Sequence, residues 1–121
     1  MTYDSTFQVQ SESVPGVILT VRRVSVAGRL ELLRRVRELT SRLEFYQAGA
    51  RLEDKLGVSM ASAEVESLYV IWGVIDIDGL TIDGIKATPE LLVSSGPEAL
   101  VREAATVVRS QLGLSEDERK N

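Results

Sequence analysis

Residues 16–47, GVILTVRRVSVAGRLELLRRVRELTSRLEFYQ, decide the fold because their pattern changes from strand-like to helical within one short stretch. The run from Val17 to Val21 is apolar and rich in β-branched residues, which is typical of a strand. Ser25 then offers a good helix N-cap, and we expect the helix to run to about Ala48, where Gly49 ends it. The helix carries one apolar stripe at helical spacing, made of Leu32, Val36, Leu39, Leu43 and Tyr46.

A second strand precedes this stretch. In residues 6–10, Phe7 and Val9 alternate with polar side chains, and Pro15-Gly16 fits the two central positions of a type II turn. A hairpin of two strands is only marginally stable alone. We therefore expect it to pack on the long helix.

The chain beyond the long helix predicts a connector over residues 49–59 and then a second helix. That helix runs from Ser59 or Met60 to Trp72 and is closed by Gly73. Its Tyr69 and Trp72 supply much of the aromatic content, so we place them in the core.

The last third of the chain predicts tight turns and then helices. Asp-Gly pairs at 78–79 and 83–84 indicate short extended segments over residues 74–87. Thr88-Pro89 opens a short helix through Val93, and Ser95-Gly96-Pro97-Glu98 opens a third main helix over residues 97–112. The outer face of that helix carries Arg102, Glu103, Thr106 and Arg109.

These elements predict one α+β domain over residues 1–121. An N-terminal β-hairpin packs on a small bundle of three main helices, and a turn-rich extended segment lies between the second and third helices. Residues 1–5 and 114–121 are expected to be flexible ends.

The residue types that are missing exclude several kinds of chemistry. The chain has no Cys and no His, which excludes disulfides, zinc-thiolate sites and Ser-His or Cys-His catalysis. Counted from Asp76, an EF-hand pattern fails because Leu80 and Thr81 occupy the fifth and sixth positions. No glycine-rich phosphate loop, signal peptide or membrane-spanning stretch is found. We therefore expect no enzymatic activity, no metal, no cofactor and no membrane partner.

A block of arginines stands out in an acidic chain. Between Arg22 and Arg42 the chain carries seven Arg and two Glu, although its net charge is −4. Glu31 and Glu38 lie one helical turn before Arg35 and Arg42 and can pair with them. The other arginines suit a solvated face, a protein partner or, less well, nucleic acid. Leu30 and Phe45 lie off the apolar stripe, and we expect the hairpin or the loop near Gly49 to cover them; if left exposed they would suit a partner. The candidate partner-binding residues are Arg22, Arg23, Arg29, Leu30, Arg34, Arg37 and Phe45.

Several short phrases resemble the small tail assembly chaperones of tailed bacteriophages and prophages. They are a Phe-containing first strand, Gly16-Val17-Ile18-Leu19-Thr20-Val21, and the polar start Arg23-Val24-Ser25 of a helix with Arg29-Leu30-Glu31. The later stretch Leu68-Tyr69-Val70-Ile71-Trp72-Gly73 and the ending Gly113-Leu114-Ser115-Glu116-Asp117-Glu118-Arg119-Lys120-Asn121 resemble uncharacterised phage and prophage proteins of this size. The resemblance spans most of the chain but includes no catalytic motif.

The resemblance implies a non-enzymatic role in the cytoplasm of the host bacterium. The chain would bind the helix-rich tape measure protein, with the tail-tube protein as a further partner, and would assist assembly of the tail tube. A structural or connector component of the particle or of a related injection machine is the alternative, and a nucleic-acid-associated regulator using the Arg-rich helix is the third. The apolar stripe from Leu32 to Tyr46 also allows a homo-oligomer.

Overall fold

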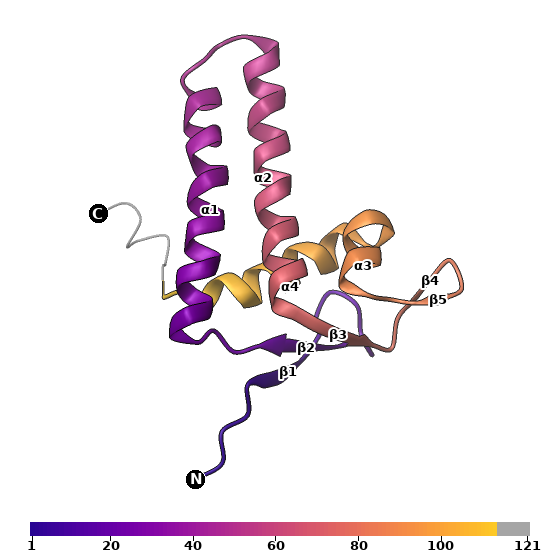
Figure 1. Ribbon diagram of the computed structural model, residues 1–121. Helices are drawn as coiled ribbons and strands as arrows, with labels where there is room; N and C mark the ends of the chain where they lie inside the picture. The colour runs from indigo at the N-terminus through magenta and orange to yellow at the C-terminus, as the bar shows by residue number, and fades with distance from the viewer. Residues whose placement is uncertain (114–121) are drawn as a thin grey trace.

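The computed structural model describes residues 1–113 and confirms the α+β fold, with an N-terminal antiparallel hairpin followed by helices and small sheets (Figure 1). In chain order the elements are β1 (Thr6–Gln10), β2 (Ile18–Arg22), α1 (Val26–Gln47), α2 (Leu52–Gly73), β3 (Val74–Asp78), β4 (Thr81–Ile82), β5 (Ile85–Lys86), α3 (Pro89–Ser95) and α4 (Glu98–Ser110). The C-terminal phrase 114–121, expected to be a flexible end, lies outside the described residues.

The hairpin becomes part of a three-stranded sheet. β1 and β2 pair from Thr6 opposite Arg22 to Gln10 opposite Ile18. The Val17 amide donates to the Val14 carbonyl over 3.2 Å and Gly16 has φ +89°, as the predicted type II turn requires. After α2 the chain returns as β3, which pairs antiparallel with β2. The first part of the turn-rich segment therefore extends the hairpin.

The second Asp-Gly pair makes a small hairpin of its own. Asp83 and Gly84 have φ of 51° and 78°, which are the two positive values of a type I′ turn, and they join β4 to β5. At the end of β5 the Lys86 Nζ lies 3.0 Å from Asp76 Oδ1 and 3.5 Å from Asp78 Oδ1. The hydrogen bond and the charge of Asp76 raise the pKa of Lys86. This side chain therefore links the small hairpin to β3.

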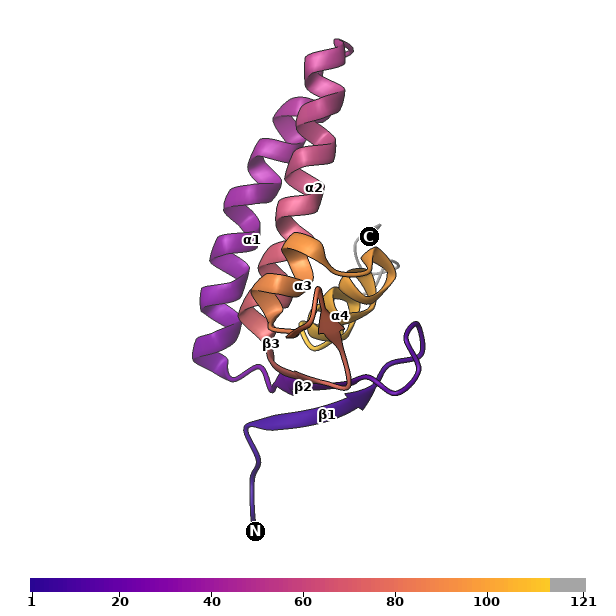
Figure 2. The ribbon, with the colours of Figure 1, turned by 90° about the vertical axis from the view of Figure 1, so that its right-hand side faces the viewer.

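α1 and α2 form an antiparallel helical arm that projects away from the sheet and from α3 and α4 (Figures 1 and 2). α1 begins as predicted, with Ser25 Oγ accepting a hydrogen bond from the Gly28 amide over 3.0 Å. The predicted connector over 49–59 is wrong, because α2 already begins at Leu52. Gly57 lies within α2, and a Cβ at this position would lie only 2.5 Å from the Tyr46 ring. The glycine lets Tyr46 pack against α2.

The core lies at the base of the arm, where the sheet meets all four helices. Tyr69 and Trp72 are 5% and 6% exposed, so the prediction that they belong to the core is confirmed. α4 packs across α2 so closely that Gly73, the last residue of α2, lies against Val108. The largest fully buried side chains come from every layer and include Leu19, Leu32, Ile77, Leu92 and Leu100.

Glu103 of α4 holds the loop between β1 and β2, which its predicted place on the outer helix face did not reveal. Its carboxylate accepts hydrogen bonds from Ser11 Oγ at 2.5 Å, from the Glu12 amide at 2.7 Å and from Ser13 Oγ at 2.8 Å. Partial burial raises the pKa of Glu103, but the hydrogen bonds together lower it by more. The resulting pKa lies below the ordinary value of 4.5. The charged form is therefore favoured by folding.

Removing this carboxylate is expected to lower stability at neutral pH and to change its pH dependence. Because folding lowers the pKa of Glu103, its contribution is complete above the unfolded pKa and is lost as the pH falls through the folded pKa. Glu103→Gln should cost about 1–2 kcal/mol of unfolding free energy at pH 7 and less at pH 3. Urea unfolding across this range measures the effect, with exposed Glu44→Gln as the control. A cost that is equal at both pH values would contradict the argument.

Candidate functional site

The arm carries a hollow on each side of the seam between α1 and α2. The first, which we call the α4 groove, has a volume of about 570 Å³ and lies between α1, α2 and α4. The second, which we call the α3 groove, has a volume of about 730 Å³, is shallower, and lies between α1, α2 and α3. α1 contributes different residues to each: Leu33, Val36, Thr40 and Leu43 to the α4 groove, and Glu31, Arg35 and Leu39 to the α3 groove.

The α4 groove combines an apolar floor with a charged edge. Two of the predicted stripe residues, Val36 and Leu43, are only half-buried and line it. Arg102 and Arg109 of α4 and Glu66 of α2 stand at its border, and Arg102 pairs with Glu98 at 2.7 Å. The remaining lining residues are Leu33, Thr40, Ser62, Val65, Tyr69, Ala105, Thr106 and Leu112. Three helices with apolar side chains between them present the surface that a fourth amphipathic helix needs.

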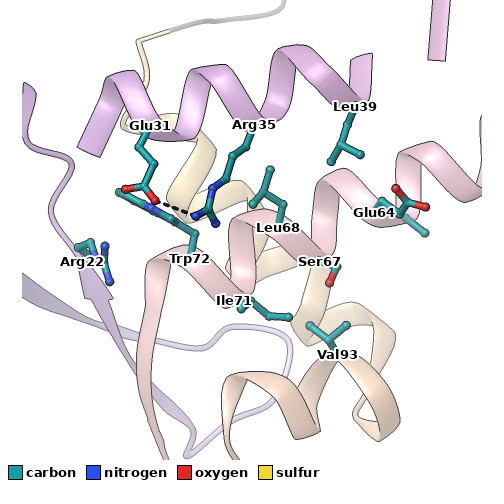
Figure 3. A pocket seen from close by; sticks show the side chains of 11 residues that line it. Arg22, Glu31, Arg35, Leu39, Glu64, Ser67, Leu68, Ile71, Trp72 and Val93 are labelled. Carbon is teal, nitrogen blue, oxygen red and sulfur yellow. Dashed lines mark ion pairs between the residues drawn. The ribbon is translucent and has the colours of Figure 1, made fainter. Parts of the chain in front are cut away.

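The α3 groove has an aromatic and cationic end. Figure 3 shows Arg22 and Trp72 at that end of the groove, with Leu39 and Glu64 toward the other. The Arg22 guanidinium carbon lies 4.6 Å from the centre of the Trp72 ring, a cation–π contact. The Trp72 Nε1 is buried and has no hydrogen-bond partner among residues 1–113. Along the upper edge Arg35 pairs with Glu31 at 2.9 Å, as predicted (Figure 3).

Arg23 and Arg29, which also have no acidic residue one helical turn away in the sequence, contact other parts of the fold. The guanidinium carbon of Arg23 lies 5.1 Å from the centre of the Phe7 ring, and its Nε donates to the Asp4 carbonyl. Arg29 donates to the Leu112 and Gln111 carbonyls at 2.7 and 3.1 Å, where α4 ends.

Two arginines on the outer side of α1 stay available. Arg34 and Arg37 are exposed and form no ion pair within the described part of the chain. The predicted pairing of Arg42 with Glu38 is wrong, because Arg42 crosses to α2 and pairs with Glu64 at 2.9 Å. The arginine block therefore divides into side chains used by the fold and the pair Arg34 and Arg37.

Replacing Arg29 by alanine is expected to cost about 1–2 kcal/mol of unfolding free energy, since it removes a cation and two hydrogen bonds from the C-terminal end of α4. Arg34→Ala and Arg37→Ala should each stay within about 0.5 kcal/mol of the unmodified chain. Thermal or urea unfolding of the three variants measures this difference. Equal effects in all three would mean that the bonds of Arg29 contribute nothing to stability.

Leu30 and Phe45 are exposed, so the expectation that the hairpin or the loop covers them is wrong. Leu30 is 52% and Phe45 is 74% exposed, and the Phe45 ring makes a T-shaped contact with Tyr46. Fifteen residues of helix separate them, a distance of about 22 Å, so they do not form one site. α2 also has an exposed apolar face, and the first two of its residues fall in the predicted connector. It consists of Leu52, Leu56, Met60 and Ile71.

Comparison with protein-family models, with curated proteins and with solved structures finds no match for this chain. Residues 1–113 contain no cluster of three or more acidic side chains placed to hold a metal ion. No described helix is long and apolar enough to span a membrane. Among residues 1–113 the α4 groove and the α3 groove are the candidate sites, and their partly apolar linings suit the binding of another surface.

Proposed function

We propose that this protein is a non-enzymatic tail assembly chaperone of a tailed phage or prophage and that it binds a helical segment of the tape measure protein. The observation that carries the proposal is the α4 groove, an open hollow that is lined in part by the apolar side chains Val36 and Leu43 of α1 and Val65 of α2. An amphipathic helix with apolar side chains at positions i, i+3 and i+7 fits such a groove. The family resemblance supplies the identity of that helix.

A chaperone must hide an apolar helix and later release it. A groove lined by half-buried side chains with a charged border suits reversible binding, because polar rims favour specificity over permanent association. The nucleic-acid alternative has less support, since Arg22, Arg23 and Arg29 of the arginine block contact Trp72, Phe7 and the end of α4.

The test is co-expression with a phage tape measure protein. A chaperone should keep that protein soluble, co-purify with it and be absent from finished particles. Detection of this chain in purified particles would instead favour the structural or connector alternative. Binding to DNA or RNA that weakens steeply with salt would favour the regulator. A tape measure protein that is equally soluble without this chain would contradict the proposal.

A further inference from the structure

α2 carries an exposed apolar stripe that no other element of residues 1–113 covers. Leu56, Met60 and Ile71 are 55%, 64% and 44% exposed. Ala63 and Ser67 lie between them at spacings that keep all five on one side of the helix. The stripe extends about 22 Å along α2. We call it the α2 stripe.

The α2 stripe runs along the α3 groove and continues toward the tip of the arm. Ala63, Ser67 and Ile71 line the α3 groove. Met60 lines a smaller hollow of about 60 Å³ nearer the tip, beside Gly57 and Tyr46. Glu64 borders both hollows, so they are neighbours along the arm.

The shape of the α2 stripe is complementary to itself when a second copy runs antiparallel. Its tip end is bulky, with Leu56 and Met60, and its middle is small, with Ala63 and Ser67. Its base end lies beside the hollow between α1 and α3. An antiparallel copy would place the bulky tip of each chain over the base hollow of the other, and the small residues would let the two helices approach closely at the centre. Such an arrangement has a two-fold axis, in which the same surface is used by both copies.

The charges along the stripe fit the same arrangement. Arg22 lies at the base end and Glu53 at the tip end, and neither forms an ion pair with another residue of 1–113. If Leu56 lies opposite Ile71 of a second copy, Glu53 lies opposite Val74 of that copy. Within each chain Val74 pairs with Val21, the residue before Arg22. Each end would therefore bring Glu53 toward Arg22. Within residues 1–113 neither is in an ion pair, and the guanidinium of Arg22 lies over the Trp72 ring. At the centre, Glu64 is already neutralised by Arg42 at 2.9 Å.

We propose that two copies of this chain associate through the α2 stripe, with their α2 helices antiparallel around a two-fold axis near Ala63. This dimer leaves the α4 groove on the other side of each arm open, so the proposal does not depend on the proposed function. A helix of a different protein is the competing occupant of the α2 stripe.

Cysteine cross-linking tests the position of the axis. Because the chain has no cysteine of its own, a disulfide can form only at an introduced cysteine. Ala63→Cys lies at the proposed axis and should form a disulfide-linked dimer under mild oxidation. Ser62→Cys is exposed but faces the α4 groove, so it should cross-link at least about tenfold more slowly. Equal cross-linking of both variants, or faster cross-linking of Ser62→Cys, would overturn the proposal.

Sedimentation or light scattering on the unmodified chain tests association itself. A dimer is expected, and Met60→Glu should raise its dissociation constant at least about tenfold, because it places a charge inside the interface. Ile85→Glu introduces the same charge at an equally exposed apolar residue in β5 and should leave the dimer intact. A monomer at all accessible concentrations, or equal effects of the two variants, would overturn the proposal.

A charge exchange then tests the register: Glu53→Arg should weaken the dimer, and adding Arg22→Glu should restore it. Failure of the double variant to restore would reject this register.

Discussion

Gly73→Ala is expected to lower the free energy of unfolding by about 2–3 kcal/mol, although alanine is ordinarily the better helix former by about 1 kcal/mol. A Cβ at Gly73 would lie 2.4 Å from Val108 Cγ2 and 2.7 Å from Cγ1. Val108 is fully buried and its β-branched side chain is stiff, so it cannot turn away. The helices α2 and α4 would have to separate at the point where they pack. Urea unfolding monitored by circular dichroism measures the loss.

A double-variant cycle separates this contact from a general effect on the helix. Val108→Ala alone removes two buried methyl groups and should cost about 2–3 kcal/mol. Combined with Gly73→Ala it also makes room for the new Cβ, so the double variant should be about 1–2 kcal/mol more stable than the sum of the single effects predicts. Strictly additive losses would show that the two residues do not compete for space.

Gly73 also shows what can be predicted from the sequence and what cannot. Its place at the end of α2 was predicted correctly, but the reason for a glycine there could not be, since the close approach of α4 is a tertiary contact. Gly57 is a second example. The sequence predicts a connector over residues 49–59, but α2 runs through this glycine, and the ring of Tyr46 occupies the space where a side chain would lie.

Local signals that are satisfied within a few residues were predictable. Ser25 caps α1, the Pro15-Gly16 turn forms, and Thr88 Oγ1 accepts from the Leu91 amide at 3.1 Å to open α3. Long-range pairing was not predictable. Arg42 had an acid one turn away and still pairs with Glu64 on α2, and Glu103 has its partners about ninety residues earlier in the chain.

The same division applies to the candidate site. The arginine block marked α1 as unusual, and Arg34 and Arg37 do remain exposed without ion pairs within residues 1–113. The grooves could not be located, because each requires the positions of three helices. For the stripe residues Val36 and Leu43 the sequence favours internal packing and also allows a helix–helix interface. Both are half-buried and line the α4 groove.

Thr40→Arg is expected to weaken binding of a tape measure helix at least about tenfold, which corresponds to about 1.4 kcal/mol. Thr40 lines the α4 groove between Val36 and Leu43, so an arginine there would fill the groove and add a charge near Arg102 and Arg109. Among residues 1–113 the Thr40 hydroxyl donates a hydrogen bond only to the Arg37 carbonyl of its own helix, and arginine is a better helix former than threonine. Stability should therefore stay within about 0.5 kcal/mol of the unmodified chain. Pull-down and calorimetry with the co-expressed partner segment measure the loss.

Ser41→Arg is the matched control because it makes nearly the same chemical change one residue further along α1. Ser41 is exposed on the outer side of α1, where Arg34 and Arg37 lie, and it does not line either groove. If the α4 groove holds the helix, Ser41→Arg should bind as the unmodified chain does while Thr40→Arg does not. Loss of binding in Ser41→Arg alone would move the site to the arginine-bearing outer face. If folded Thr40→Arg binds normally, the helix does not bind in the α4 groove. The chaperone proposal then loses the observation that supports it.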